Sequence, residues 1–308
     1  MDMDTVQAPM RCLVSGSSGM LGTALRGALA AQSIPMLQLV RRPPSGKDEL
    51  QWNPAASPPV ADIAALEGCA AAIHLSGANV ASRRWTRSWR REMTRSRVDS
   101  TLALATSLAS LHTPPQVLLV ASAIGIYGNR GEELLDEDSS PGVGFLADLC
   151  TRWEAAAQPA VDAGIRVVHL RFGVVLGPGK GALAQMLPLF RLGLGGTLGN
   201  GRQWMSWISL ADAVSAILFA LQTPQLTGAI NLTAPHPVTN AQFTSALARQ
   251  LHRPAILPAP AFALRLALGQ MADEALLASA RVLPARLLHA GFHFQHNTVE
   301  EALAAALG

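Results

Sequence analysis

Three glycines at a spacing of three residues lie near the start of the chain, in the stretch VSGSSGMLG. Between a strand and a helix, the first such glycine permits a tight turn and the second lets the backbone approach a pyrophosphate. The third lets helix and strand pack closely, while the helix N-terminus faces the phosphate charge. A structural tight turn is the alternative. We therefore expect a dinucleotide to bind at Gly16, Ser17, Ser18, Gly19, Met20, Leu21 and Gly22.

The second apolar run of the chain indicates which dinucleotide is bound. An NAD site usually has an acidic residue near the end of this strand, where it bonds the ribose hydroxyls. Residues 36–47 contain no acid, and the run ends in Arg41 and Arg42. A guanidinium suits a 2′-phosphate, so these arginines favour NADP(H) over NAD(H). The alternative is a solvated basic turn.

Strands and helices alternate around these residues. Short apolar runs at 11–15, 36–40, 71–75, 117–121 and 166–170 are typical of buried parallel strands. Helical stretches at 20–32, 85–111 and 145–163 separate them, and further helices are expected at 210–222 and 240–251. The pattern predicts an α/β protein with a doubly wound parallel Rossmann sheet. A smaller, mainly helical C-terminal domain should lie on the substrate side.

Composition excludes several other classes. Of the 308 residues, 49% are hydrophobic and 15% charged, so a large core is expected, and the net charge of +3 does not indicate nucleic acid. Scattered Cys12, Cys69 and Cys150 suggest a reducing compartment. No apolar run approaches the roughly 18 residues of a membrane span. Residues 1–10 carry no basic segment typical of a secretory signal, so we expect a cytoplasmic protein without a membrane partner.

Motifs along nearly the whole chain, from about residue 11 to 300, resemble the extended short-chain dehydrogenase/reductases of the NAD-dependent epimerase/dehydratase type. They are SGSSGMLG, IHLSGANVASRRWT, SRVDST, ASAIGIYG, RFGVVLGPGKGAL, SWISLADAV, GAINLTAPHPVTN and LLHAGFHF. The resemblance is closest to an atypical, epimerase-like branch of uncharacterised activity, some members of which are labelled cell-division inhibitor homologues. It implies an NADP-binding domain over 11–235 and a substrate-side region over 236–308, with a small domain of unknown function from about 253.

The resemblance also implies roles for individual residues. Arg97 stands where the superfamily has an active-site Asn, and Ser122 where it has a catalytic Ser. Further cofactor contacts are expected at Leu75, Ser76, Gly77, Ala78, Asn79, Arg97, Phe172, Gly173 and Val174. Contacts with a small-molecule substrate are expected at Tyr127, Arg202, Gln203 and Trp207. Relatives often form dimers, so a homodimer is left open.

The Tyr-x-x-x-Lys pair that moves protons in this superfamily is absent from the sequence. Tyr127 is the only tyrosine, and four residues later lies Gly131. By the resemblance, the pair falls on Leu146 and Cys150. A proton would then come from Ser122, Cys150 or water, with Arg97 lowering the pKa of the thiol. The alternative is that Cys150 is a small buried hydrophobic residue and Ser122 ends a strand.

Other polar groups have structural interpretations beside functional ones. Asp136, Glu137 and Asp138 indicate a polar loop or acid/base chemistry, and Glu154 indicates a surface ion pair or an acid beside Cys150. Arginines 84, 87, 91 and 95 share a helical face that could meet nucleic acid. Because no aromatic or loop motif of a known nucleic-acid reader accompanies them, a solvated or interface surface is favoured. A structural interpretation is favoured for His289, His293 and His296, because the segment GFHF around His293 alternates like a strand. No Cys or acid lies within this cluster, so no metal is expected.

Two functions are consistent with these observations. The first is an NADP(H)-dependent oxidoreductase or epimerase-like enzyme whose proton donor is not a tyrosine. The second is a protein that senses NADP(H) and regulates a partner without turnover, for instance in cell division. The retained Ser122 and the loop at 202–207 favour the first function, and the missing Tyr and Lys favour the second.

Overall fold

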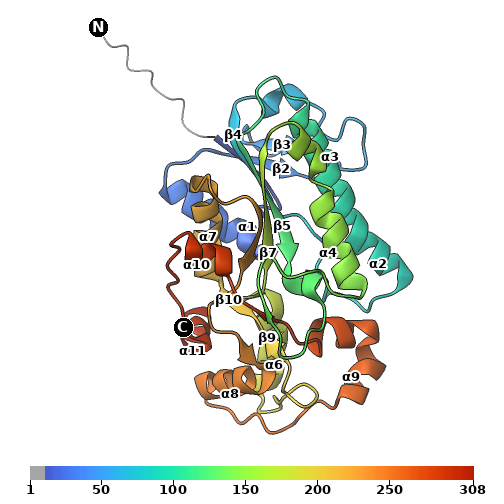
Figure 1. Ribbon diagram of the computed structural model, residues 1–308, viewed down its shortest axis with the longest axis vertical. Coiled ribbons are helices and arrows are strands. Elements are labelled where there is room, and N and C mark those ends of the chain that lie inside the picture. The colour runs from blue at the N-terminus through green and yellow to red at the C-terminus, as the bar shows by residue number, and fades with distance from the viewer. Residues whose placement is uncertain (1–10) are drawn as a thin grey trace.

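A seven-stranded parallel sheet forms the centre of the computed structural model, which describes residues 11–308 (Figure 1). The prediction about a secretory signal falls on residues 1–10, outside the described part. Both the sheet and its Rossmann strand order agree with the predicted fold class. In spatial order the strands are β11 (Gly228–Leu232), β7 (Arg166–Phe172), β5 (Val117–Ala123), β4 (Cys69–His74), β1 (Arg11–Ser15), β2 (Met36–Val40) and β3 (Glu49–Gln51).

The five predicted strands all belong to this sheet, and their apolar runs explain why. Residues 12–14 of β1 are almost inaccessible to solvent, as expected for strands covered on both faces. Two edge strands complete the sheet. The three-residue β3 was not predicted, because its Glu-Leu-Gln sequence carries no strand pattern. The other edge strand, β11, pairs in parallel with β7.

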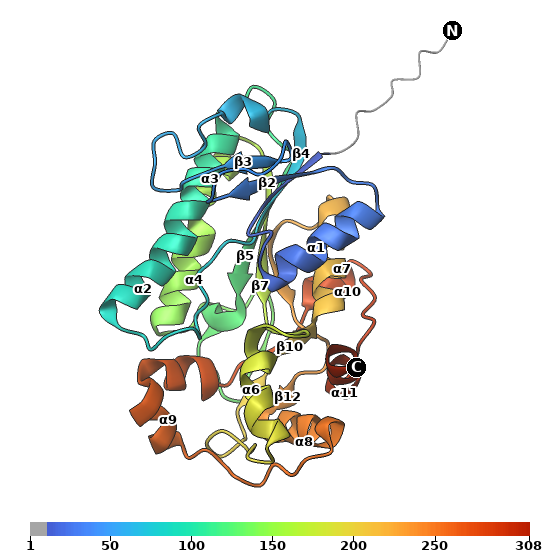
Figure 2. The same cartoon turned by 180° about the vertical axis from the view of Figure 1, so that it is seen from behind.

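Helices cover both faces of the sheet (Figures 1 and 2). One face packs against α1 (Met20–Ala31) and α7 (Leu210–Gln222), which also contact one another. The other face packs against α3 (Ser100–Ala109), α4 (Phe145–Ala155) and α5 (Gln158–Asp162). These two layers bring the carboxyl ends of the strands to one edge, where open α/β sheets place their ligands.

The helix expected over 85–111 is interrupted. It consists of α2 (Arg87–Thr94), a π-helical turn η2 (Arg95–Asp99) and α3. The side chain of Thr86 caps α2 by accepting from Trp89 N, so the helix begins two residues later than predicted. Single π-turns often mark functional sites, and this one carries Arg97.

A second lobe lies below the carboxyl edge of the sheet. Its core joins α6 (Gly181–Arg191), α8 (Asn240–Leu251) and α11 (Val299–Leu307). The remaining helical elements are η1 (Ile63–Leu66), η3 (Ile124–Tyr127), α9 (Ala261–Leu268), η4 (Ala272–Leu276) and α10 (Ala285–His289). Three short strand pairs are β8 (Val174–Leu176) with β10 (Trp207–Ser209), β9 (Trp204–Met205) with β12 (Val238–Thr239), and β6 (Leu134–Leu135) with β13 (Arg281–Val282).

The strand-like interpretation of the segment GFHF was wrong. Residues 291–294 follow α10 without strand pairing. Phe292 packs edge-on against Phe294 with ring centroids 4.8 Å apart, and against Phe219 of α7 at 5.3 Å. The apolar alternation therefore serves an aromatic cluster over α7.

Candidate cofactor-binding site

The glycine loop has the geometry of a phosphate cradle. Gly16 has a φ of +76°, and a Cβ added there would lie 2.7 Å from the carbonyl carbon of Leu75. A Cβ on Gly22 would collide with the Gly16 carbonyl oxygen. Gly19 N donates to the same oxygen at 3.1 Å and closes the turn directly before α1. The loop thus leaves backbone amides and a helix N-terminus open toward the edge of the sheet, which fits a dinucleotide.

A cavity of about 850 Å³ opens beside this loop. Its walls come from the ends of β1, β2 and β4, from α2 and η2, and from the first residue of α3. Ten of the predicted cofactor residues line it: Gly16, Ser17, Ser18, Gly19, Arg41, Arg42, Leu75, Ser76, Gly77 and Ala78. The other predicted contacts, Met20, Leu21, Gly22, Asn79, Arg97, Phe172, Gly173 and Val174, do not line this cavity.

The structure adds a detail to the arginine pair that sequence reasoning missed. Arg42 donates to both carboxylate oxygens of Glu49, at 2.8 and 2.6 Å, because pairing of β2 with β3 brings Glu49 back beside the arginines. This hydrogen bond holds the pKa of Glu49 at about 2. Arg41 is exposed, and Arg26 of α1, which was not predicted, also lines the cavity. Arg26, Arg41 and Arg42 thus form the basic corner of the cavity, and one of the three guanidinium groups, that of Arg42, is held by a carboxylate.

A polar chain lies beside the cavity, which two of its members, Ser76 and Ser100, line. His74, at the end of β4, bonds Ser15 through Nδ1 and Ser100 through Nε2. Ser76 donates to Ser15 at 3.1 Å and completes the chain. Complete burial of the imidazole lowers the pKa of His74 to about 4, so it is neutral at physiological pH. This chain fixes the ends of β1 and β4, which carry the glycine loop and the 75–78 segment.

At the positions of the missing Tyr and Lys, the structure offers no ionised group. Leu146 packs in an apolar cluster with Phe145, Leu268 and Met271. Cys150 is buried, and burial raises the pKa of its thiol to about 12, which Arg97 offsets only in part. The pKa lowering expected from Arg97 is thus outweighed, because the thiol lies in a cluster with Ile126, Val282 and other apolar residues. Cys150 is a protonated thiol at neutral pH.

Arg97 itself lies between the cavity wall and α4. Its guanidinium carbon is 5.0 Å from the ring centroid of Trp153 and would contact a Cβ on Gly77 at 3.3 Å. Its Nη1 donates to the Met93 carbonyl at 3.3 Å. Burial lowers the pKa of Arg97, but the group stays charged at neutral pH. It therefore places a positive charge beside residues 75–78.

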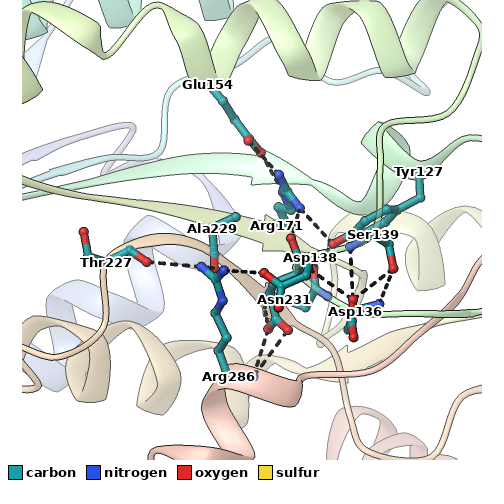
Figure 3. A network of polar contacts seen from close by, with 11 residues as sticks. Tyr127, Asp136, Asp138, Ser139, Glu154, Arg171, Thr227, Ala229, Asn231 and Arg286 are labelled. Atoms are coloured by element: carbon teal, nitrogen blue, oxygen red, sulfur yellow. Dashed lines mark hydrogen bonds and ion pairs between the residues drawn. The ribbon is translucent and has the colours of Figure 1, made fainter.

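Ser122 belongs to a buried network rather than to the cavity wall. Its hydroxyl donates to Glu154 at 2.7 Å, and Arg171 bonds the same carboxylate at 2.8 and 2.9 Å. Arg171 also donates to the hydroxyl of Tyr127, which in turn donates to Asn231 (Figure 3). Glu154 is thus a largely buried ion-pair partner of Arg171 and not part of a surface ion pair, and its negative charge also acts on the Cys150 thiol.

The network continues into the acidic loop. Glu137 is buried and accepts from Asn231 N at 2.9 Å and from Arg286 N at 3.3 Å. The side chain of Arg286 reaches Asp138 at 2.7 Å (Figure 3). The loop at 136–138 therefore ties β11 to α10, which supports its structural interpretation.

The predicted substrate residues are only partly accessible. Tyr127 and Trp207 have no exposed surface, so neither side chain reaches a substrate in this structure. The Trp207 Nε1 donates to the His236 carbonyl, and Gln203 Nε2 donates to the carbonyls of Leu198 and Leu276. Arg202 is exposed. Their polar and aromatic character indicated a binding role, but long-range packing uses three of the four for the interior.

The N-terminus of α4 receives an acceptor from far along the chain. Gly144 precedes the helix and offers no side-chain cap. The Glu274 carboxylate from η4 instead accepts from Phe145 N at 3.1 Å and from Leu146 N at 2.8 Å. Gln270 donates to Glu274 and accepts from Arg90 of α2 at 2.9 Å. The C-terminal region thereby holds the helix that carries the Leu146 and Cys150 positions.

The remaining candidates have local partners. On the predicted arginine face, Arg87 and Arg91 are exposed and Arg95 pairs with Glu92 at 2.7 Å. His296 Nδ1 lies 3.0 Å from the Ser209 hydroxyl and 3.4 Å from Asp212, which fits a structural role. Among residues 11–308, no group of three or more His, Cys, Asp or Glu side chains could hold a metal ion. No helix in that range is long and apolar enough to span a membrane.

The fold and the glycine loop together define a Rossmann-type dinucleotide-binding protein. Its architecture is that of the short-chain dehydrogenase/reductase epimerases. A family model described as "NAD dependent epimerase/dehydratase family" matches residues 12–232. A second model, "Domain of unknown function (DUF1731)", matches residues 259–306. The chain belongs to the NAD dependent epimerase/dehydratase family.

Relatives extend over almost the full length of the chain. An epimerase family protein of Mycobacterium bovis is 47% identical over 95% of this chain and 96% of its own. The human epimerase family protein SDR39U1 is 34% identical over 96% of this chain and 98% of its own. A crystal structure of that human protein (isoform 2) with NADPH superposes with a TM-score of 0.89, over 96% of this chain and 99% of the other.

Proposed function

We propose that the protein binds NADP(H) in the cavity beside the glycine loop and acts as an oxidoreductase or epimerase-like enzyme on a small organic substrate. The observation that carries the proposal is the position of Arg41 and Arg42 in the cavity wall, directly after β2. The NADPH in the human relative supports the same cofactor. When bound, NADP(H) supplies hydride chemistry.

The chain's own residues would divide the binding between them. Backbone amides at 16–19 and the α1 N-terminus would hold the pyrophosphate. Arg41, with Arg42 and Arg26, would face the 2′-phosphate. Arg97 would add positive charge on the side of the site nearer α4. The Ser122 hydroxyl donates its proton in a hydrogen bond to Glu154, and the buried Cys150 thiol, with a pKa of about 12, is too weak an acid to release its proton at neutral pH. A proton needed by the reaction would therefore come from water or from the substrate itself.

A second function, an NADP(H)-responsive regulator without turnover, is favoured by one specific observation. The positions of the superfamily's proton-transfer pair hold Leu146 and a thiol with a pKa of about 12. Both functions require the cofactor, so cofactor binding is tested first.

Calorimetric titration of NADPH and NADH into the full-length protein tests cofactor binding, which both functions require. We expect NADPH to bind more tightly, and equal affinities would overturn the NADP(H) assignment. A panel of carbonyl compounds and nucleotide sugars, followed by NADPH absorbance, then separates the two functions. Turnover with any member supports the enzyme, and tight NADPH binding without turnover across the panel supports the regulator.

A further inference from the structure

A groove lined by arginines lies between α2 and α4, which are side by side in both views (Figures 1 and 2). It encloses about 840 Å³ and lies on a different face of α2 from the cofactor cavity. Within residues 11–308, Asp99 is the only carboxylate in its lining. Positive charge therefore predominates in the groove, and it comes from Arg87, Arg90 and Arg91 of α2, Arg95 of η2 and Arg152 of α4.

Three of these guanidinium groups are accessible and lack a counter-charge. Arg87, Arg91 and Arg152 are exposed, and no carboxylate in the described part of the chain lies within ion-pair distance of them. Arg95, in contrast, pairs with Glu92 at 2.7 Å. The groove thus presents free cations from two helices to a ligand in solution.

The positions of the arginines on α2 do not stabilise that helix. Arg87 is its first residue, and no acid is present in the first turn. The helix macrodipole disfavours a cation at this end. Arg87, Arg91 and Arg95 follow one another at intervals of four residues, a spacing at which like charges destabilise a helix. Residues that break local rules without benefit to the fold are expected at functional sites.

An apolar side chain lies among the arginines. Phe145, the first residue of α4, lines the groove and is half-buried. The guanidinium carbon of Arg90 is 5.8 Å from the centroid of its ring, and Trp85 packs against the ring at 5.5 Å. Arg90 is held in this position by its bond to Gln270 at 2.9 Å. The groove therefore combines a fixed apolar surface with free guanidinium groups.

These features favour one kind of ligand over two others. A second copy of the chain fits poorly, because a two-fold interface would place the same arginines on both sides. Single-stranded nucleic acid also fits poorly, because its bases need an open aromatic face and the Phe145 ring is already packed by Arg90 and Trp85. A peptide that carries both carboxylates and an aliphatic side chain can use all parts of the groove.

We propose that the groove between α2 and α4 docks an acidic segment of a partner protein. Its carboxylates bind Arg87, Arg91 and Arg152, and an aliphatic side chain of the segment packs on Phe145. A guanidinium forms two parallel hydrogen bonds with a carboxylate, which suits this contact. The inference goes beyond the proposed function, because the groove is separate from the cofactor cavity, although Arg95 and Asp99 line both.

The experiment measures peptide binding to the full-length protein by fluorescence anisotropy at an ionic strength of about 0.15 M, so that weak surface attraction is screened. The probes are labelled eight-residue peptides with six glutamates and two leucines at varied positions. The same peptides with glutamine in place of glutamate serve as the uncharged comparison. NADPH is present at saturation, so that the basic corner of the cofactor cavity is occupied.

The variants remove one cation from each side of the groove. They are Arg91→Gln, Arg152→Gln and the double variant. The matched control is the double variant Arg191→Gln, Arg253→Gln, which removes two exposed arginines of the second lobe. Thermal unfolding of each variant verifies that it is folded.

We expect saturable binding of at least one acidic peptide by wild type and by the control, and at least about tenfold weaker binding of its glutamine counterpart. Arg91→Gln and Arg152→Gln should each weaken binding about threefold or more, and the double variant at least about tenfold. The inference is overturned if no acidic peptide binds, if the glutamine peptides bind equally well, or if Arg152→Gln binds like wild type.

Two further measurements test the other ligands. A ten-nucleotide single-stranded DNA that binds more tightly than every peptide, and depends on Arg91 and Arg152, would overturn the choice of a protein partner. Dimerisation that depends on the same two arginines, followed by analytical ultracentrifugation without peptide, would assign the groove to a second copy and also overturn it.

Failure of the proposed function is visible separately. If NADPH does not bind, the cofactor assignment fails, and the peptide titrations are repeated in an Arg41→Ala, Arg42→Ala background, where two cations of the basic corner are removed. Peptide binding that depends on Arg91 and Arg152 in that background still supports the docking groove. Binding that does not depend on them there overturns it.

Discussion

Arg171 and Glu154 form a two-bond ion pair beneath the carboxyl edge of the sheet, with Nε 2.8 Å from Oε1 and Nη2 2.9 Å from Oε2. Both side chains are about nine-tenths buried. The carboxylate also accepts from Ser122, which Arg171 faces across β5 and β7. The superfamily's serine position is therefore part of a charged structural network.

Removing the carboxylate should destabilise the fold strongly. Burial by itself would raise the pKa of Glu154, but the bonds from Arg171 outweigh it and keep the pKa below its ordinary value. Glu154→Ala leaves the Arg171 charge buried without its partner, so we expect a loss of about 3–5 kcal/mol of unfolding free energy, measured by urea denaturation. The matched control is Glu300→Ala, which breaks the exposed Arg249–Glu300 pair and should cost less than about 1 kcal/mol. Similar losses in both variants would contradict this account.

The basic corner of the cavity should determine cofactor choice. Replacing Arg41 and Arg42 together by alanine should cost about 1.5–3 kcal/mol of NADPH binding, the scale of charged hydrogen bonds. NADH affinity serves as the internal control and should stay unchanged, because NADH lacks the 2′-phosphate. The measurement is a parallel titration of NADPH and NADH into wild type and the double variant. An equal loss of NADH affinity would show that the arginines act on a part of the cofactor other than the 2′-phosphate.

Tyr127 should matter for stability and not for the cofactor. Its hydroxyl joins Arg171 to Asn231, and burial raises its pKa, which Arg171 lowers only in part. Tyr127→Phe keeps the ring and leaves buried polar partners unsatisfied, so we expect a loss of about 1–3 kcal/mol in stability. NADPH affinity should remain at the wild-type value. A hundredfold loss of turnover on an identified substrate, with folding and NADPH binding intact, would instead make Tyr127 a catalytic group.

His74 should make stability depend on pH in a defined window. Its pKa is about 4 in the folded protein, against about 6.5 when unfolded, so the unfolded chain binds the proton first as pH falls. Stability from the neutral imidazole is fully present above pH 6.5 and is lost between about pH 6.5 and 4, by about 3 kcal/mol. The measurement is urea denaturation at several pH values for wild type and His74→Gln. The variant should show a shallower fall across this window, and identical slopes would exclude His74 as the cause.

Short-range patterns carried most of what the sequence could predict. The glycine loop, its strand and its helix lie within 21 consecutive residues from β1 to α1, so their spacing alone indicated the cradle. Arg41 and Arg42 were found for the same reason. The Arg42–Glu49 pair was missed because it depends on the pairing of β2 with an edge strand that has no apolar pattern.

Long-range contacts explain the rest of what was missed. Glu154 and Arg171 meet through the packing of α4 on the central sheet, and Arg281 reaches Trp204 from another part of the C-terminal region. Tyr127 and Trp207 were assigned to the substrate by residue type, yet the sheet edge and the second lobe enclose them completely. No local periodicity distinguishes a buried aromatic residue near a site from one that lines it.

The acceptor for the first amides of α4 follows them by about 129 positions. Chains are synthesised from the N-terminus, and their early parts begin to fold first. While the ribosome has not yet passed residue 274, the first turn of α4 can satisfy its N–H groups only with water, since Gly144 supplies no cap. The nascent protein can thus assemble its nucleotide-binding half early, but α4 reaches its final state only when nearly the entire chain has been translated.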